Sequence, residues 1–365
     1  MSETTPPTPP AVPPHQQPIV IQTPEPKRTG WLKRIFTGLL AMLLILSIVM
    51  NVYLAAIVAN TMAGPMEQVV LREGSEEEQI AVFEVSGTIT DASAASFGRF
   101  ARLVMDDATI KGVVIRVETP GGAVAPSDQI YKDILDLQAA GRPVVISMGG
   151  VAASGGYYIS APADMIYAEH TTTTGSIGVI AGWLVISGTL DKLGMEPVVM
   201  KSTAARGWKD EISPLQKPDR RQREHLQSIL DSMQQRFEMI VRQGRGDKLA
   251  LKEKTYEMEV EVDGETRTVS HTETIPLNGK VYIGPQAKEV GLVDKIGYFD
   301  DAVQEARDLA GAPKARVVQY RPRRGVMHAI LYGDGQASTP QTPILTREFI
   351  EEIRTPRIEM IWRVE

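Results

Sequence analysis

The stretch GVVIRVETPGGAVAPSDQIYKDILDLQAAGRPVVISM, residues 112–148, contains two β-branched runs separated by a Pro-Gly-Gly turn and a helical segment. Continuous β-branched runs are typical of strands that are buried on both faces, as in a parallel sheet. Between the runs, Ile130, Ile134 and Leu137 fall on one helical face, and Gly141 is placed to end the helix. This order predicts two parallel strands joined by a right-handed helical crossover.

The alternation of strands and helices continues on both sides of this stretch. Repeated strand–helix units imply an α/β fold with a mainly parallel sheet. A short helix is expected to start near Ser154 and to stop at Pro162. In residues 256–275 the pattern changes to period two around Asp263-Gly264, which predicts a β-hairpin. The remaining expected strands are residues 81–89, 165–169 and 196–201, and the remaining expected helices are residues 96–107, 188–194, 219–241 and 299–311.

The N-terminal part of the chain contains an apolar segment long enough to cross a membrane. Residues 35–66 carry no charge, and about 20 apolar residues span a bilayer. A cleaved signal peptide is the alternative, but its apolar region usually has only about 7–15 residues and follows a short leader. We therefore expect an uncleaved transmembrane helix at residues 31–60. Basic residues precede it and acidic residues follow it, which predicts a cytoplasmic N-terminus and an extracytoplasmic remainder.

Composition limits the other possibilities. Residues 1–30 hold nine prolines and are expected to form a disordered tail, and residues 61–79 are expected to form a polar linker. The folded domain is then expected at residues 80–312, followed by a C-terminal segment at 313–365. The absence of cysteine excludes disulfides and thiolate catalysis, and the net charge of −6 gives no reason to expect nucleic-acid binding.

Two glycine-containing turns are candidates for acyl-transfer chemistry. In GGVAASGGYYISAPAD, residues 149–164, Ser154 lies at an expected helix start, where free N–H groups can stabilise an oxyanion. Close packing of a helix on a strand explains the same small residues, and Ala152 departs from the G-x-S-x-G elbow. The Pro-Gly-Gly turn of TPGGAV, residues 119–124, exposes backbone N–H groups, although a structural turn explains it nearly as well.

The partner that would take a proton from Ser154 is less obvious. None of the five histidines has a carboxylate placed to orient it, and no two stand at metal-ligand spacing; they are His15, His170, His225, His271 and His328. A lysine near neutrality requires burial, because its unperturbed pKa is about 10.4. The segment KSTAARGWKDEISP offers Lys201 and Lys209, the latter beside Trp208. Ser176, between glycines, is placed to orient an amine, but solvated lysines and a turn serine are the simpler interpretation.

Taken together, these stretches resemble the signal peptide peptidase A (SppA) family, the S49 serine peptidases. The similarity extends over residues 80–310, and its most specific motifs are A-S-G-G-Y-Y and T-G-S-I-G-V. It implies a crotonase/Clp-protease-like fold of repeated ββα units, with Ser154 as nucleophile and Lys209 as general base. It also implies that Ser176 orients the lysine and that Gly122 and Gly155 form the oxyanion hole. Lys201 stays an alternative base, because the segment from Lys201 to Lys209 is longer than the family pattern, and the hairpin at 256–275 looks like an insertion.

The resemblance also carries expectations for the whole protein. Short family members form rings of eight subunits in which the serine and the lysine of one site come from neighbouring protomers. Apolar peptides near the membrane, including remnant signal peptides, are the implied substrates, and neither a metal nor an organic cofactor is implied. The alternatives are a non-catalytic membrane scaffold and a crotonase-type acyl-CoA enzyme.

Overall fold

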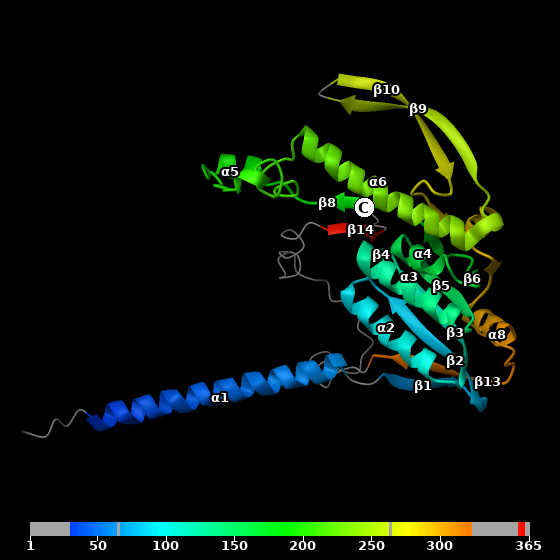
Figure 1. Cartoon of the computed structure of the whole chain (residues 1–365), viewed down its shortest axis with the longest axis horizontal. Coiled ribbons are helices and arrows are strands. Elements are labelled where there is room, and N and C mark those ends of the chain that lie inside the picture. The colour runs from blue at the N-terminus through cyan, green and yellow to red at the C-terminus, as the bar shows by residue number, and fades with distance from the viewer. Residues whose placement is uncertain (1–29, 64–65, 263–264, 323–356, 362–365) are drawn as a thin grey trace, which may run out of the picture. The chain divides into compact units, whose positions relative to one another are not determined.

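The computed structural model describes residues 30–63, 66–262, 265–322 and 357–361, and its chain divides into two compact units, residues 1–63 and 64–365 (Figure 1). The first unit contains helix α1, Gly30–Ala63, whose segment Lys33–Leu54 has a mean hydropathy of 2.4. By length and composition this helix is suited to cross a membrane, as expected. The expected proline-rich tail lies outside the described residues, apart from Gly30.

The second unit is built on a nine-stranded, mostly parallel sheet. All neighbouring pairs from β13 to β12 run parallel, which confirms the predicted α/β fold. Two short strands complete it, with β7 parallel to β5 and β11 antiparallel to β7. Its main order is β1 (Glu67–Arg72), β13 (Ala315–Arg321), β2 (Ser75–Ser86), β3 (Ile110–Thr119), β5 (Val144–Ala153), β6 (Met165–Ala168) and β12 (Lys295–Ile296), with β7 at Thr173–Gly175 and β11 at Val281–Ile283.

Strand alternation divides the core into two layers. Phe83 and Val85 of β2 pack into the larger cluster with residues of α2 (Asp91–Asp106) and α3 (Val124–Ala139). Ile80 and Val82 point the other way and join the cluster that contains residues of α8 (Phe299–Leu309). Phe83 also meets two aromatic rings of α2. Helices therefore cover both faces of the sheet, as Figure 1 shows.

The long helix α6, Arg220–Arg245, starts with a capping box between Asp219 and Gln222. This agrees with the expected helix at 219–241 and extends it by one turn. The expected hairpin is confirmed as β9 (Lys252–Val262) and β10 (Glu265–Ile275), a separate two-stranded sheet. The remaining elements are β4 (Gly121–Ala123), α4 (Gly155–Ser160), β8 (Ile180–Gly182), α5 (Ser187–Lys192), α7 (Gly284–Glu289), β14 (Arg357–Ile361) and short 3₁₀ turns at Thr203–Ala205 and Gly246–Lys248.

Two domain boundaries and one strand that the sequence predicts are wrong. The expected linker at 61–79 contains β1 and the start of β2, because short strands with polar side chains resemble linkers in composition. The expected C-terminal segment at 313–365 begins with β13, which pairs with both β1 and β2. The run expected as a strand at 196–201 is not in a sheet, and Val198 and Met200 are 85% and 93% exposed.

Candidate active site

Ser154 occupies the turn between β5 and α4. Its backbone has φ 54° and ψ −114°, and the residue is 1% exposed. The amide of Ser154 donates to the carbonyl oxygen of Gly175 at 2.8 Å, and its Oγ lies 3.5 Å from the carbonyl oxygen of Gly178. A non-glycine residue with positive φ costs about 1–3 kcal/mol and persists only where the surroundings impose it.

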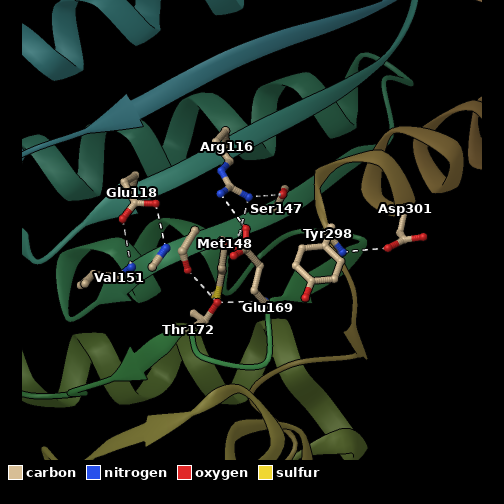
Figure 2. Close-up of polar contacts among 11 residues, drawn as sticks. Arg116, Glu118, Ser147, Met148, Val151, Glu169, Thr172, Tyr298 and Asp301 are labelled. Atoms are coloured by element: carbon tan, nitrogen blue, oxygen red, sulfur yellow. Dashed lines mark hydrogen bonds and ion pairs between the residues drawn. The ribbon is translucent and has the colours of Figure 1, made fainter. Parts of the chain in front are cut away.

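A change of pairing partner along β5 creates this turn. Residues up to Met148 pair with β6, whereas Val151 to Ala153 pair with β7. At the transition, the carboxylate of Glu118 accepts hydrogen bonds from the amides of Gly150 and Val151, at 2.8 and 3.2 Å (Figure 2). A Cβ on Gly149 would lie 1.6 Å from Glu118 Oε2, so a side chain there would displace the Glu118 carboxylate from these hydrogen bonds.

A polar cluster braces the same turn from the neighbouring strand ends. Thr172 donates through Oγ1 to the carbonyl of Gly149 at 2.6 Å and accepts from the amide of Glu169 (Figure 2). Arg116 in turn pairs with Glu169 at 2.7 Å and donates to Ser147 Oγ at 3.0 Å. The residues that precede the nucleophile candidate are therefore held by strands β3, β5 and β6 together.

The candidate oxyanion-hole glycines lie close to each other. A Cβ added to Gly155 would be 3.1 Å from the amide nitrogen of Gly122 and 2.8 Å from Ser127 Oγ. A Cβ on Gly121 would be 2.7 Å from the amide nitrogen of Gly155. The Pro-Gly-Gly turn and the start of α4 thus approach each other closely at glycines, with the Ser127 hydroxyl beside them, and backbone N–H groups of this kind can stabilise an oxyanion.

A cavity of about 430 Å³ adjoins this site. Its lining includes Ser176 and Gly178 from the segment after β7 and His271 and Glu273 from the hairpin strand β10. Ser176 has φ 50°, and its amide donates to the carbonyl of Lys280 at 2.8 Å. Hydrogen bonds from Tyr256, Lys280 and Asn278 lower the pKa of Glu273 to about 2, so Glu273 is charged at neutral pH and is paired with Lys280.

Strand β14 lies beside Ser154 and was not expected from the sequence. It pairs antiparallel with β4 on one side and with β8 on the other (Figure 1). The side chain of Met360 is fully buried, and a Cβ on Gly155 would lie 3.1 Å from the Met360 carbonyl oxygen. An extended segment of this chain therefore occupies an edge between two strands directly at the nucleophile candidate. The alternation in RIEMI, residues 357–361, is the signal that could have found it.

The two candidate lysines lie on the segment that precedes α6. Lys209 is exposed and has φ 68°, and within the described residues no hydrogen bond or ion pair involves its amine. Lys201 instead forms an ion pair with the buried carboxylate of Asp210. Figure 1 shows α5 and the N-terminal end of α6 projecting away from the sheet, whereas α4 lies against it. The chain thus brings Ser154, Ser176, Gly122 and Gly155 together and places both lysines elsewhere.

The histidines do not offer a different base. His170 is exposed, and the ring of His225 packs edge-on against Trp208 at 5.3 Å. His271 packs against Tyr256 at the hairpin. His15 and His328 lie outside the described residues. Within the part of the chain that the structure describes, no group of three His, Asp or Glu residues is arranged to hold a metal ion.

Comparison with known proteins identifies the family of this chain. The sequence model of Peptidase family S49 matches residues 136–258 and 250–313. A protein of Enterococcus faecium, whose name assigns it to signal peptide peptidase SppA, is 34% identical over 263 residues, or 69% of each chain. Protease 4 of Haemophilus influenzae is 33% identical over 66% of this chain and 36% of its own length. The chloroplastic serine protease SPPA of Arabidopsis thaliana is 31% identical over 58% of this chain and 28% of its own.

The fold, the strained serine turn and these similarities define a serine peptidase. The chain belongs to peptidase family S49, together with its SppA and Protease 4 relatives. It spans about a third of the length of Protease 4 of Haemophilus influenzae, but more than two thirds of the protein of Enterococcus faecium.

Proposed function

We propose that this chain is a membrane-anchored endopeptidase in which Ser154 is the nucleophile and Lys209 is the general base. One observation carries the proposal. Within the described residues, only three non-glycine residues have positive φ, and they are Ser154, Ser176 and Lys209. These are the three side chains that the motifs assign to nucleophile, orienting hydroxyl and base. Because backbone strain gathers at functional sites, the coincidence supports all three assignments.

The proposed reaction proceeds through an acyl-enzyme. Oγ of Ser154 attacks the carbonyl carbon of a peptide bond while the neutral amine of Lys209 takes its proton. The amides of Gly122 and Gly155 donate hydrogen bonds to the oxyanion. The C–N bond then breaks as the lysine ammonium returns the proton to the leaving amine. Water, activated by the same lysine, attacks the ester and releases the second product.

Lys201 is the weaker candidate for the base. Its amine already donates to the Asp210 carboxylate, so it is engaged in an ion pair within the same loop. The amine of Lys209 has no such partner within the described residues, and the residue is exposed in a single chain. A second molecule that covers Lys209 would supply the missing desolvation.

We therefore also propose that the active form is a homo-oligomer with sites shared between protomers. Ser154 and Lys209 form no hydrogen bond within the described chain. Several large apolar residues on the segment that precedes the lysine loop are exposed, and exposed apolar side chains that gather on one segment favour an interface. The most exposed are Leu193 at 66%, Met195 at 57%, Val198 at 85% and Met200 at 93%.

The groove between β4 and β8 indicates the class of substrate. It holds an extended segment through β pairing, the way many proteins bind peptides. The segment's Met360 side chain is buried there, so an apolar residue fits this position. Together with an anchor in α1, this favours apolar peptides at the membrane, including remnant signal peptides, cleaved on the extracytoplasmic side.

Labelling and matched lysine variants test the proposal. A fluorophosphonate is expected to modify Ser154 of the full-length protein in detergent, and Ser154→Ala is expected to abolish hydrolysis of an apolar reporter peptide. Lys209→Arg should be inactive, because arginine stays protonated, whereas Lys201→Arg keeps the charge beside Asp210 and should stay active. Absence of the label on Ser154 would instead support a non-catalytic scaffold. An active Lys209→Arg variant would disprove the assigned base.

A further inference from the structure

Both chain neighbours of Lys209 are fixed to the start of α6. On one side, the Trp208 ring packs edge-on against His225 at 5.3 Å, with the Arg221 guanidinium 5.2 Å above it. On the other side, Asp210 is 6% exposed although it belongs to a loop. Lys209 between them is exposed and has φ 68°. The loop is thus anchored on each side of a single outward-facing residue.

The anchor on the Asp210 side is a network of hydrogen bonds. Its carboxylate accepts from Lys201 Nζ, from Gln216 Nε2 and from Gln222 Nε2, the last at 3.0 Å. The hydrogen bond from Lys201 is the main cause of a lowered pKa for Asp210, which keeps this carboxylate charged. The Gln222 amide also donates to the carbonyl of Gly207 at 3.0 Å. Gln222 itself belongs to the capping box of α6, so the network ends on the long helix.

The burial of the Asp210 carboxylate in a surface loop calls for an explanation. A carboxylate removed from water is unfavourable unless charges and hydrogen bonds compensate for its lost hydration. The loop has no other buried polar group, since Asp210 is its only buried residue between 201 and 216 in the described chain. The network fixes the backbone next to Lys209, whose positive φ is a conformation that residues other than glycine rarely adopt.

We infer that Asp210 is a positioning residue for Lys209 and that Lys201 is the counterion of Asp210. This rests on the proposed role of Lys209 as general base. In the assembled protein, the network holds the amine of Lys209 at the correct place to meet Ser154 of a neighbouring copy. Displacement of a catalytic group by about 1 Å costs up to about a hundredfold in rate, which sets the size of the expected effect.

Kinetics of Asp210→Asn provide the first test. This change keeps the shape of the side chain and removes its charge. We expect kcat of the full-length oligomer to fall between about ten- and a hundredfold with KM unchanged, because Asp210 does not line the groove. Asp191→Asn, an exposed change on the nearby α5, is the matched control and should have no effect. A wild-type kcat for Asp210→Asn, or a loss seen only in KM, would overturn the inference.

Co-assembly of different variants provides the second test, which a merely structural defect would not satisfy. If Asp210 acts with Lys209, oligomers mixed from Ser154→Ala and Asp210→Asn chains regain activity, because some sites combine an intact serine with an intact loop. Oligomers mixed from Lys209→Ala and Asp210→Asn chains should not exceed the activity of Asp210→Asn alone. Activity well above that level in the second mixture would contradict the inference.

The outcomes separate this inference from the proposed function. If Lys209→Ala alone is active, Lys209 is not the base and both ideas fail. If Lys209→Ala is inactive while Asp210→Asn behaves as wild type, the proposed function stands and the positioning role is wrong. If Ser154→Ala and Lys209→Ala chains do not complement each other, sites are not shared between protomers. The role of Asp210 is then decided by the first test alone, in which Asp210→Asn should lower kcat and leave KM unchanged.

Discussion

At the residue scale, Ser154, Ser176 and Lys209 have positive φ, a backbone conformation that lowers stability at the positions to which we assign a function. Ser176 is the simplest case. Its φ of 50° is a backbone conformation that glycine adopts more easily than serine. A serine kept there costs about 1–3 kcal/mol relative to an unstrained residue. Ser176 lines the cavity that adjoins the Ser154 turn, and the hydroxyl that the proposed function uses gives a reason for a serine to be present.

Replacing Ser176 should therefore separate the two effects. Ser176→Gly relieves the strain and is expected to raise the melting temperature of the peptidase unit, while kcat falls because the hydroxyl is lost. Ser176→Ala loses the same hydroxyl but keeps the strain, so kcat should fall without a gain in stability. Thermal unfolding and peptide hydrolysis of both variants provide the measurement. A fully active Ser176→Gly variant would show that the hydroxyl has no role in positioning the base.

The sequence was informative about the nucleophile turn but not about the lysine. Ser154, Gly155 and Gly122 lie at the ends of buried strands, where hydrophobic runs and glycines mark the position of the turn. The choice between Lys201 and Lys209 depends on Asp210, whose burial and three donors come from residues spread over 22 positions. Local sequence does not reveal such a network, because an aspartate in a polar loop is usually solvated.

At the scale of elements, the sequence predicts the buried strands β3 and β5, but it does not predict the short strands β1 and β14. β3 and β5 are nearly continuous apolar runs, whereas β1 and β14 combine short length with charged residues. The run at 196–201 shows the opposite error, because its apolar residues resemble a buried strand but remain exposed within one chain. Sequence composition does not distinguish a surface buried by the same chain from one covered by a second copy.

A buried ion pair fixes the C-terminal end of α6, in addition to the apolar packing of Phe237, Ile240 and Val241 in the core. Arg245 is 2% exposed and binds Asp294 through two nitrogens, at 3.1 and 2.8 Å. Asp294 also accepts from the amide of Ile166 at 2.8 Å. Burial by itself raises the pKa of Asp294, but the hydrogen bonds from Arg245 and Lys248 outweigh it and lower the pKa. The pair is therefore charged at neutral pH.

Asp294→Asn should destabilise the peptidase unit by about 3–5 kcal/mol at pH 7, because it leaves Arg245 buried without its counterion. A lowered pKa in the folded state means that the stabilisation is complete above the unfolded value, about 3.9, and is lost as pH falls through the lower folded value. The difference between wild type and variant should therefore shrink below about pH 4. Urea unfolding at pH 7 and pH 3 measures this, and a difference independent of pH would contradict it.

The position of β14 leads to a prediction about activity. A strand that pairs with both β4 and β8 excludes any other extended peptide from that groove. Deleting residues 357–365, or replacing the buried Met360 with aspartate, should therefore lower KM for a reporter peptide. Steady-state kinetics of both variants with one apolar reporter peptide provide the measurement. An unchanged KM in both would mean that substrates bind elsewhere.

At the scale of the whole molecule, the proposed active site is incomplete in one chain. Ser154 and the Gly122 and Gly155 amides lie beside the sheet at the ends of β5 and β3. Lys209 lies in the loop before α6, where its neighbours Trp208 and Asp210 contact His225 and Gln222. The segment between α5 and α6 also carries Val198 and Met200, which are 85% and 93% exposed, the highest values for large apolar residues in the part of the chain that the structure describes. One contact between copies would cover these residues and also bring a lysine to a neighbouring serine.

Charged residues in this region should therefore abolish both assembly and activity. The double variant Val198→Glu with Met200→Glu is expected to have a smaller molar mass in detergent and to lose peptide hydrolysis. Its melting temperature should stay close to that of wild type, because these side chains have few contacts within one chain. Leu309→Glu, an exposed change at the end of α8, is the control and should leave mass and activity unchanged. Light scattering coupled to chromatography measures the mass, and a dissociated variant with full activity would refute the shared site.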